Sequence, residues 1–274
     1  MNQLEMYCLS IHDKLLEKIN QIGYIPVGLG SFDYSSGWLR DNTGDNISHK
    51  NKNYGEYTFH YWFWKNILEK TEIDNWVGFC AQRRFWSNDK NIKKINNFED
   101  LNANVLKSVP EEWNNYDVII GNEIKVTNIP WIKIIKYGKQ AIFENPKSIF
   151  KSKRNIKFQF DMFHGCGLLD KAINLLPEQD KFDFRKYVEG KNSYNQGNMF
   201  ICKSKKIMSN YYSSIFEWLF KCEKIFGFNL HGYSKQRIYG FLAERYLPYW
   251  FSKYSNNLIW PVIFYNLMDI TNEK

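Results

Sequence analysis

The chain lacks the short motifs by which many enzymes reveal a cofactor or a nucleophile. It contains no GxxxxGKS/T phosphate-binding loop, no GxSxG elbow and no HExxH zinc-binding helix. Gly28 and Gly30 lack the third glycine of a GxGxxG fingerprint, so they are weak support for a dinucleotide site. These absences argue against the best-defined nucleotide, hydrolase and zinc-protease classes.

Cysteines are few and scattered: Cys8, Cys80, Cys166, Cys202 and Cys222. Their number is odd and no two form a CxxC pair, which excludes a zinc ribbon and argues against a disulfide framework. We expect reduced, half-buried thiols in a reducing compartment.

Long apolar segments are also missing. The longest apolar stretch, 258–268, contains Pro261 and Asn266 and is too short to span a bilayer. The N-terminus has neither the basic region nor the apolar core of a signal peptide. The expected location is therefore the cytoplasm.

Positive charge and aromatic side chains are abundant. The formal charge is +8, and aromatic residues make up 18% of the chain. Such a surface favours anionic partners, and aromatic rings stack on sugars and bases and sit at membrane interfaces. Much of the charge is lysine dispersed among Asn and Ile, which a biased composition explains equally well.

Local sequence patterns predict strands and helices that alternate in the first half of the chain. Short apolar runs predict strands, and apolar residues spaced three and four apart predict helices. In chain order we predict strand 6–11, helix 13–22, strand 24–28, helix 54–68, strand 76–80, strand 116–120, helix 167–176, strand 198–201, helix 206–226 and helix 234–254. This order favours an α/β fold with a mostly parallel, doubly wound sheet and a helical C-terminal part.

Two segments lack any period. Residues 31–53 are predicted to be a loop, and residues 88–110 a polar, exposed segment. No linker or repeat divides the chain, so we expect a single domain over residues 1–274.

The polar loop 39–48 is the first candidate site. In open α/β sheets, ligands bind beyond the carboxyl ends of the strands. The loop offers two carboxylates, two amides, two hydroxyls and a glycine that suit a hydroxyl-rich ligand such as a ribose or hexose. These donor-side candidates are Asp41, Asn42, Thr43, Gly44, Asp45 and Asn46. The alternative is a surface loop rich in Asx turns.

Adjacent arginines follow the predicted strand 76–80. Arg83 and Arg84 can clamp a diphosphate through bidentate, charge-assisted hydrogen bonds. The alternative is a solvated pair of surface charges.

Two later segments hold acid–base candidates. Asp161 and His164, three residues apart, form a catalytic or metal-binding pair on one interpretation and a helix-entry turn on the other. Glu244 and Arg245 lie in a largely apolar helix, where they form either a buried structural salt bridge or an acid facing a cleft.

Taken in order, these segments resemble a family of bacterial capsule and O-antigen glycosyltransferases, formerly known only as a domain of unknown function, with galactofuranosyltransferases among its members. The most specific feature is the TGDNIS loop followed by a helix rich in Tyr and Trp. The matching stretches are 24–27 (YIPV), 39–48 (LRDNTGDNIS), 50–54 (KNKNY), 56–58 (EYT), 61–66 (YWFWKN), 77–79 (VGF), 83–85 (RRF), 198–201 (NMFI) and 240–245 (GFLAER).

The sequence departs from the family pattern at two places. Ala81-Gln82 stands where the family has His-Tyr before the double arginine. Only His164 remains of a His-rich stretch that leads to Asp-Leu, where this chain has Leu169-Asp170. The donor sugar, the acceptor or the role of an imidazole is therefore expected to differ.

The resemblance implies a GT-A-like nucleotide-sugar fold and transfer from a UDP-sugar, such as a UDP-furanose, to a polysaccharide or lipid-linked acceptor at the inner face of the membrane. Residues 1–125 would then bind the nucleotide sugar, and residues 126–274 would face the acceptor. We assign Glu56, Asn198 and Arg245 to the acceptor side.

An inverting transferase needs a carboxylate that removes the proton of the acceptor hydroxyl. Glu244 is the first candidate for this base, and Asp161 is its competitor. The Asp-x-Asp metal signature common in such transferases is missing, so Arg83 and Arg84 are the expected partners of the leaving UDP. A Mg²⁺ or Mn²⁺ ion held by Asp41, Asp45 or Asp161 is the alternative.

Two other classes compete with this interpretation. A non-catalytic carbohydrate- or nucleic-acid-binding module is compatible with the charge and the aromatics, but the lysines are dispersed and no RNA-binding motif occurs, so no nucleic-acid partner is expected. A hydrolase acting on nucleotide sugars is the other. Turnover that depends on an acceptor distinguishes the transferase from both.

Overall fold

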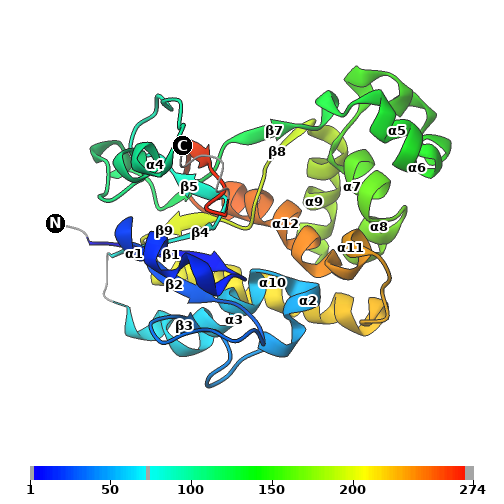
Figure 1. The fold of residues 1–274 in the computed structure, drawn as a ribbon. Coiled ribbons are helices and arrows are strands. Elements are labelled where there is room, and N and C mark those ends of the chain that lie inside the picture. The colour runs from blue at the N-terminus through cyan, green and yellow to red at the C-terminus, as the bar shows by residue number, and fades with distance from the viewer. Residues whose placement is uncertain (1–2, 72–74, 269–274) are drawn as a thin grey trace. The chain divides into compact units, whose positions relative to one another are not determined.

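The computed structural model describes residues 3–71 and 75–268 (Figure 1). The chain divides into two compact units. Unit 1 comprises Met1–Asn122, Gly197–Tyr212 and Phe251–Lys274, and unit 2 comprises Glu123–Gln196 and Ser213–Trp250.

Unit 1 is built on a nine-stranded sheet in the order β10-β6-β9-β4-β1-β2-β3, with β5 and β11 attached beside β4. The strands are β1 (Leu4–Ser10), β2 (Ile25–Gly28), β3 (Leu39–Arg40), β4 (Trp76–Ala81), β5 (Arg84–Trp86), β6 (Val118–Ile120), β9 (Phe200–Cys202), β10 (Asn257–Ile259) and β11 (Val262–Phe264). The four strands β3, β2, β1 and β4 are parallel. β9 runs antiparallel between β4 and β6, so the sheet is mixed.

The central strands are buried because their sequences are nearly continuous apolar runs, as expected for parallel strands covered on both faces. Tyr7 and Phe79 meet the rings of Phe59 and Phe63 from helix α3 (Tyr57–Asn66) on one face. On the other face Met6 and Cys8 belong to the core that contains the buried Ile19 of α1 (Leu16–Gln21). The prediction of an α/β fold is confirmed.

Short helices complete unit 1. They are α2 (Asn51–Tyr54), α4 (Phe98–Asn104) and the single-turn 3-10 helices η1 (Asp13–Leu15), η2 (Ser48–Lys50), η3 (Leu68–Lys70) and η4 (Glu111–Trp113).

Unit 2 is helical apart from one antiparallel pair of strands, β7 (Glu123–Lys125) and β8 (Ser193–Asn195), which lie far apart in the sequence. Its helices are η5 (Val126–Asn128), α5 (Trp131–Tyr137), α6 (Lys139–Glu144), η6 (Pro146–Ile149), η7 (Lys151–Lys153), α7 (Ile156–His164), α8 (Leu168–Ile173), α9 (Glu178–Gly190) and α11 (Tyr233–Gln236). The unit boundaries fall within α10 (Lys205–Phe226) and α12 (Ile238–Tyr254). A helical C-terminal region is therefore confirmed.

Several details of the predicted pattern are corrected. Residues 88–110 are not simply exposed, because α4 buries Leu101 and the following Val105 and Leu106. The predicted loop 31–53 contains β3, η2 and α2. The predicted helix 234–254 begins instead as the short helix α11, with Gly232 as its N-cap. In the described ranges no helix has both the length and the apolar content needed to cross a membrane.

Candidate functional site

The carboxyl ends of β1, β2 and β4 meet at one edge of the sheet. Ser10 pairs with Gly28 in the β1–β2 register, and Leu9 pairs with Ala81 in the β1–β4 register. The buried hydroxyl of Ser10 donates to Oε1 of Gln82, at 2.7 Å, and accepts the backbone N–H of His12. Ser10 and Gln82 therefore join the two strand ends where an α/β sheet binds ligands.

The turn after β2 is fixed by a buried carboxylate. Asp41 is fully buried and accepts the backbone N–H of Gly30 at 2.9 Å and the hydroxyl of Thr58 at 2.5 Å. Gly30 has a φ of 69°, a conformation that L side chains rarely adopt. Burial raises the pKa of Asp41, and its hydrogen bonds to Thr58 and Gly30 oppose that rise. Asp41 thus serves as an anchor of the turn rather than as a group facing solvent.

An aromatic ring and a guanidinium cover this turn. The Tyr34 hydroxyl donates to the Ser10 carbonyl at 2.8 Å and accepts the N–H of Leu29, and a Cβ at Gly28 would come within 2.8 Å of the Tyr34 ring. The Arg40 guanidinium lies 4.4 Å from the centroid of that ring. Burial raises the pKa of Tyr34 to about 12, so it stays a neutral donor. The sequence pattern gave no direct signal for Tyr34 or Arg40.

Arg40 also ties the turn together. Its guanidinium Nη2 donates to the carbonyls of Gly30 and Phe32, at 2.9 and 3.0 Å. The loop after β2 is therefore held from both sides by hydrogen bonds within the chain.

The polar loop after β3 is braced by α3. The indole N–H of Trp62 donates to the Thr43 carbonyl at 2.7 Å, and the Asn66 amide exchanges hydrogen bonds with the backbone of Asp45. Gly44 has a φ of 56°, and a Cβ there would come within 2.2 Å of Asn66 Oδ1. The loop is consequently rigid although four of its residues are exposed: Asn42, Thr43, Gly44 and Asp45.

Two side chains of this loop already have internal partners. Asp45 Oδ1 accepts the Tyr61 hydroxyl at 3.2 Å, and Asn46 Oδ1 accepts the N–H and the hydroxyl of Ser48. The second arrangement is an Asx turn, as in the structural alternative for this segment. A role of the loop in donor binding stays a prediction.

The two arginines occupy a hairpin rather than an open loop. Arg83 is exposed in the turn between β4 and β5, and the half-buried Arg84 begins β5, where it pairs with Phe264. Arg83 follows Gln82 directly and so stands at the edge marked by Ser10. Over residues 3–71 and 75–268, neither arginine has a carboxylate within ion-pair distance. Binding of an anionic ligand by these arginines stays a prediction.

Glu56 and Asn198, assigned to the acceptor side, both lie in unit 1. Glu56 is the half-buried residue before α3, and its carbonyl accepts N–H groups of the first turn. The Asn198 carbonyl accepts Nε2–H of His60 at 3.2 Å, just before β9. Burial lowers the pKa of His60 to about 4, so this ring is neutral and structural.

Asp161 in unit 2 belongs to an ion-pair network. Its Oδ2 lies 2.6 Å from Lys157 Nζ, and its Oδ1 accepts the N–H of Gly167. Lys157 also binds Asp170, which in turn binds Arg185 at 2.6 Å. Burial raises the pKa of Asp161, while Lys157 lowers it. Because both oxygens are engaged, Asp161 is poorly placed as a general base.

His164, Glu244 and Arg245 come together in unit 2. Arg245 is 1% exposed, pairs with Glu244, donates to Gln159 at 2.8 Å and lies 3.5 Å from His164 Nε2. Its guanidinium lies 4.5 Å from the Tyr194 ring centroid. Burial, followed by the nearby Arg245 charge, holds the pKa of His164 well below its usual range.

These contacts bear on the acid–base candidates in two ways. Asp161 and His164 do not hydrogen-bond to each other anywhere in the described structure, since each faces a different cation. The Glu244–Arg245 salt bridge is present, as in its structural interpretation. A catalytic role of Glu244 stays a prediction.

The carboxylates named for Mg²⁺ or Mn²⁺ do not form a common site. Asp41 is bonded to Gly30 and Thr58, Asp45 accepts Tyr61, and Asp161 is paired with Lys157. Within the part of the chain that the structure describes, no three His, Cys, Asp or Glu side chains are grouped as metal ligands.

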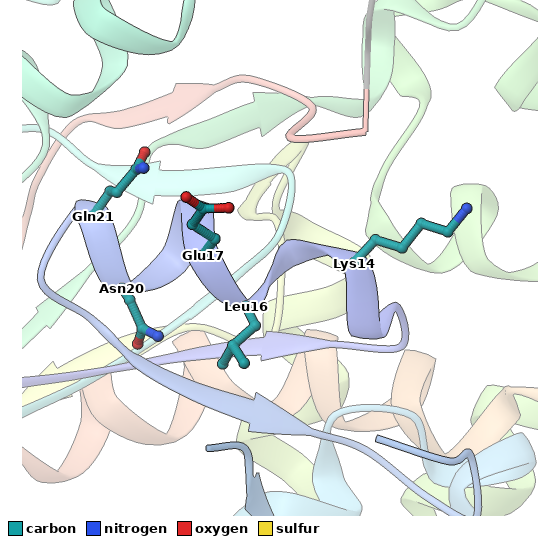
Figure 2. A pocket seen from close by; sticks show the side chains of 5 residues that line it. All are labelled: Lys14, Leu16, Glu17, Asn20 and Gln21. Carbon is teal, nitrogen blue, oxygen red and sulfur yellow. The ribbon is translucent and has the colours of Figure 1, made fainter. Parts of the chain in front are cut away.

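Two hollows are resolved within single units. One of about 370 Å³ in unit 2 is lined by Ala141, Glu144, Asn145, Asn155, Lys157, Phe158, Asp161 and Glu189. The other runs along α1, and Figure 2 shows that its side chains point in different directions and do not converge on one point. The first has the carboxylates and amides that suit a polyhydroxylated ligand; the second does not form a site.

The fold defines a class: an α/β protein with a mixed sheet, in which polar and cationic residues lie where β1, β2 and β4 end. The chain belongs to the family described as Domain of unknown function (DUF4422), which matches residues 7–256. No curated protein matches its sequence.

One solved structure resembles the chain. It is described as the WbbM bifunctional glycosyltransferase in its apo form, and it matches 96% of this chain with a TM-score of 0.55 and 18% sequence identity. The chain spans 45% of the length of that protein. At this identity the likeness concerns the fold.

Proposed function

We propose that this protein is a glycosyltransferase that moves a sugar from a UDP-sugar to a hydroxyl of a growing capsular or surface polysaccharide, with inversion at the anomeric carbon. The fold similarity to a glycosyltransferase supports sugar transfer in general. The resemblance of the TGDNIS loop and the double arginine to galactofuranosyltransferases supports a furanose donor. A lipid-linked acceptor would place the protein at the cytoplasmic face of the membrane.

The observation that carries the proposal is the cationic, preorganised edge of unit 1. Arg83 follows Gln82, whose side chain accepts the Ser10 hydroxyl where β1 and β4 end. The leaving UDP gains negative charge during transfer, and cationic side chains aimed at that charge lower the barrier. Arg83 and Arg84 are the groups we assign to the diphosphate.

The nucleotide would occupy the turn after β2. Tyr34 offers a half-buried ring there, and Arg40 and Asp41 keep the turn in place. A fixed turn binds a ligand without losing further conformational entropy. Asn42, Thr43 and Asp45 then provide exposed polar groups for the ribose or the donor sugar.

The acceptor hydroxyl needs a base, and Glu244 is our choice in unit 2. Its rival Asp161 has both oxygens bound to Lys157 and Gly167. Glu244 is paired with Arg245, and its side chain is 12% exposed. Arg245 keeps the carboxylate oriented, while the neutral His164 ring packs on Phe241, with ring centroids 4.0 Å apart.

The diphosphate assignment is tested by titrating UDP into the full chain. Arg83→Ala and Arg84→Ala should each weaken UDP affinity by roughly tenfold to 150-fold, because each removes a charge-assisted hydrogen bond. The matched control is Lys93→Ala/Lys94→Ala, which removes two exposed charges from another part of unit 1. Unchanged affinity in both arginine variants would remove them from the site.

Turnover separates the transferase from its rivals. Labelled sugar should pass from a UDP-sugar to an added acceptor. Leaving the acceptor out should not increase the release of free sugar. A binding module would bind ligand and transfer nothing, and a hydrolase would release sugar without an acceptor.

A further inference from the structure

The segment 131–153 of unit 2 exposes an unusual number of large apolar side chains. Of the eighteen large hydrophobic residues that are exposed in the described structure, seven lie in this segment: Trp131, Ile132, Ile135, Tyr137, Phe143, Ile149 and Phe150. Phe143 is 85% exposed and Ile132 is 76% exposed. Isolated apolar residues on a surface need no explanation, but a concentration of this kind marks an interaction surface.

The same segment is strongly basic. It contains six lysines and one acidic residue, Glu144. The lysines are Lys133, Lys136, Lys139, Lys147, Lys151 and Lys153, and all are exposed. Figure 1 shows α5 and α6 together at one end of unit 2, next to α7. We call these exposed apolar and lysine side chains the basic apolar surface.

The arrangement on α5 is amphipathic. Ile132 and Ile135 are three residues apart and Trp131 and Ile135 are four apart, so they share one face of the helix. Ile134 is the buried residue of this helix, 1% exposed, and it belongs to a small core with Met162. The exposed face is therefore not a frayed part of the core.

A buried arginine holds the surface in shape. Arg154 is 2% exposed and donates to the carbonyls of Ile129, Ser148 and Ile149, at 3.1–3.3 Å. Its guanidinium also lies 4.6 Å from the centroid of the Trp131 ring. These contacts bring the start of α5 to η6, so that Trp131 and Ile149 belong to one surface.

We propose that the basic apolar surface docks the protein on an anionic lipid membrane. Trp, Phe and Ile side chains inserted at the headgroup level, with lysines around them, are the composition of an interfacial anchor. The lysines complement the negative charge of anionic headgroups. A protein partner would not require this concentration of positive charge. α5 has only seven residues, so it is too short to span the bilayer and would lie in the membrane interface.

This inference deepens the proposed function, which places the protein at a membrane, by naming the surface that binds there; it requires neither a donor nor sugar transfer, so it can fail independently of them. Vesicle flotation of the full chain, without nucleotide or acceptor, tests it directly. The vesicles contain either phosphatidylcholine alone or about 30% phosphatidylglycerol, each at low and high salt. The protein should float with the anionic vesicles, less so at high salt, and weakly with the neutral ones.

Variants locate the contact. Ile132→Ser/Phe143→Ser/Phe150→Ser should weaken binding by roughly a hundredfold or more, because three inserted side chains are lost. Lys133→Gln/Lys136→Gln should weaken it by roughly thirtyfold at low salt and less at high salt. The matched control is Phe182→Ser/Phe264→Ser, at positions 71% and 70% exposed, which should bind as the wild type does.

Circular dichroism and thermal melting show whether the variants are folded; all replaced side chains are exposed, so we expect native values. The proposal is overturned if the wild type stays unbound to anionic vesicles at low salt, or if the triple serine variant floats as the wild type does. It is also overturned if the wild type is a dimer that the triple variant converts to monomers, with no vesicle binding by either. That last result would make this surface an interface between copies of the chain.

Discussion

Replacing Asp41 tests whether a buried carboxylate, rather than a ligand-facing one, organises the donor edge. In Asp41→Ala, the Gly30 N–H loses its acceptor in a buried place. The Thr58 hydroxyl keeps the Gly55 carbonyl as a partner, at 3.1 Å. One buried donor without a partner costs about 1–3 kcal/mol.

Amide hydrogen exchange measures this loss where it occurs. In Asp41→Ala the protection of the Gly30 amide should fall by roughly fivefold to 150-fold, which is the same free energy expressed as a ratio. Asp41→Asn is the matched control: its carbonyl can accept from Gly30, and its NH₂ group can donate to Thr58 Oγ1. Equal exchange in the wild type and Asp41→Ala, or equal loss in both variants, would refute the anchoring role.

The pH dependence adds an independent check. Burial raises the pKa of Asp41 in the folded state, whereas the unfolded chain has the ordinary carboxyl pKa. The folded state therefore binds this proton more tightly. Its contribution to stability is complete below the ordinary pKa and is lost as the pH rises through the raised one. As the pH falls from about 7 to about 4, the stability of the wild type should therefore rise relative to that of Asp41→Asn. A constant difference in urea unfolding over this range would contradict the burial argument.

Two further predictions concern the base and the polar loop. Glu244→Gln should lower turnover by about 10²-fold to 10⁴-fold with UDP affinity unchanged, because it removes the proton acceptor. Asp161→Asn should chiefly lower thermal stability, through the weakened bond to Lys157; a folded Glu244→Gln with near-full turnover would transfer the role to Asp161. Gly44→Ala should destabilise the loop by about 1–3 kcal/mol, because a Cβ would clash with Asn66 and the backbone has a positive φ. Urea unfolding measures the destabilisation in Gly44→Ala, and an unchanged midpoint would show that the loop adapts.

Some of the site was predictable from the sequence. The TGDNIS segment was identified as a polar loop at a strand end, and Arg83 as a cation beside β4. A polar residue at the end of an apolar strand is a usable signal, and Ser10, the last residue of β1, carries it. Tyr34 and Arg40 carry no such signal, because their contact with the turn after β2 depends on how the loop between them folds back.

The sequence by itself determined the elements whose stability is local. β1 and β4 were predictable because each is a continuous apolar run, and α10 because its apolar residues repeat at the helical period over 22 residues. The family resemblance likewise depends on local stretches, and the family match over residues 7–256 agrees with it.

The tertiary structure decided what depends on partners distant in the chain. β10 and β11 have three residues each, too few for a period, and they exist only because β6 and β5 supply their hydrogen bonds. β9 lies antiparallel between β4 and β6, a direction that no local pattern encodes. Asp41 looks like a ligand in sequence and is an anchor in space, because the groups that satisfy it, Gly30 and Thr58, lie 11 and 17 residues away. A carboxylate's role is set by which donors surround it, and those donors come together only when the chain folds.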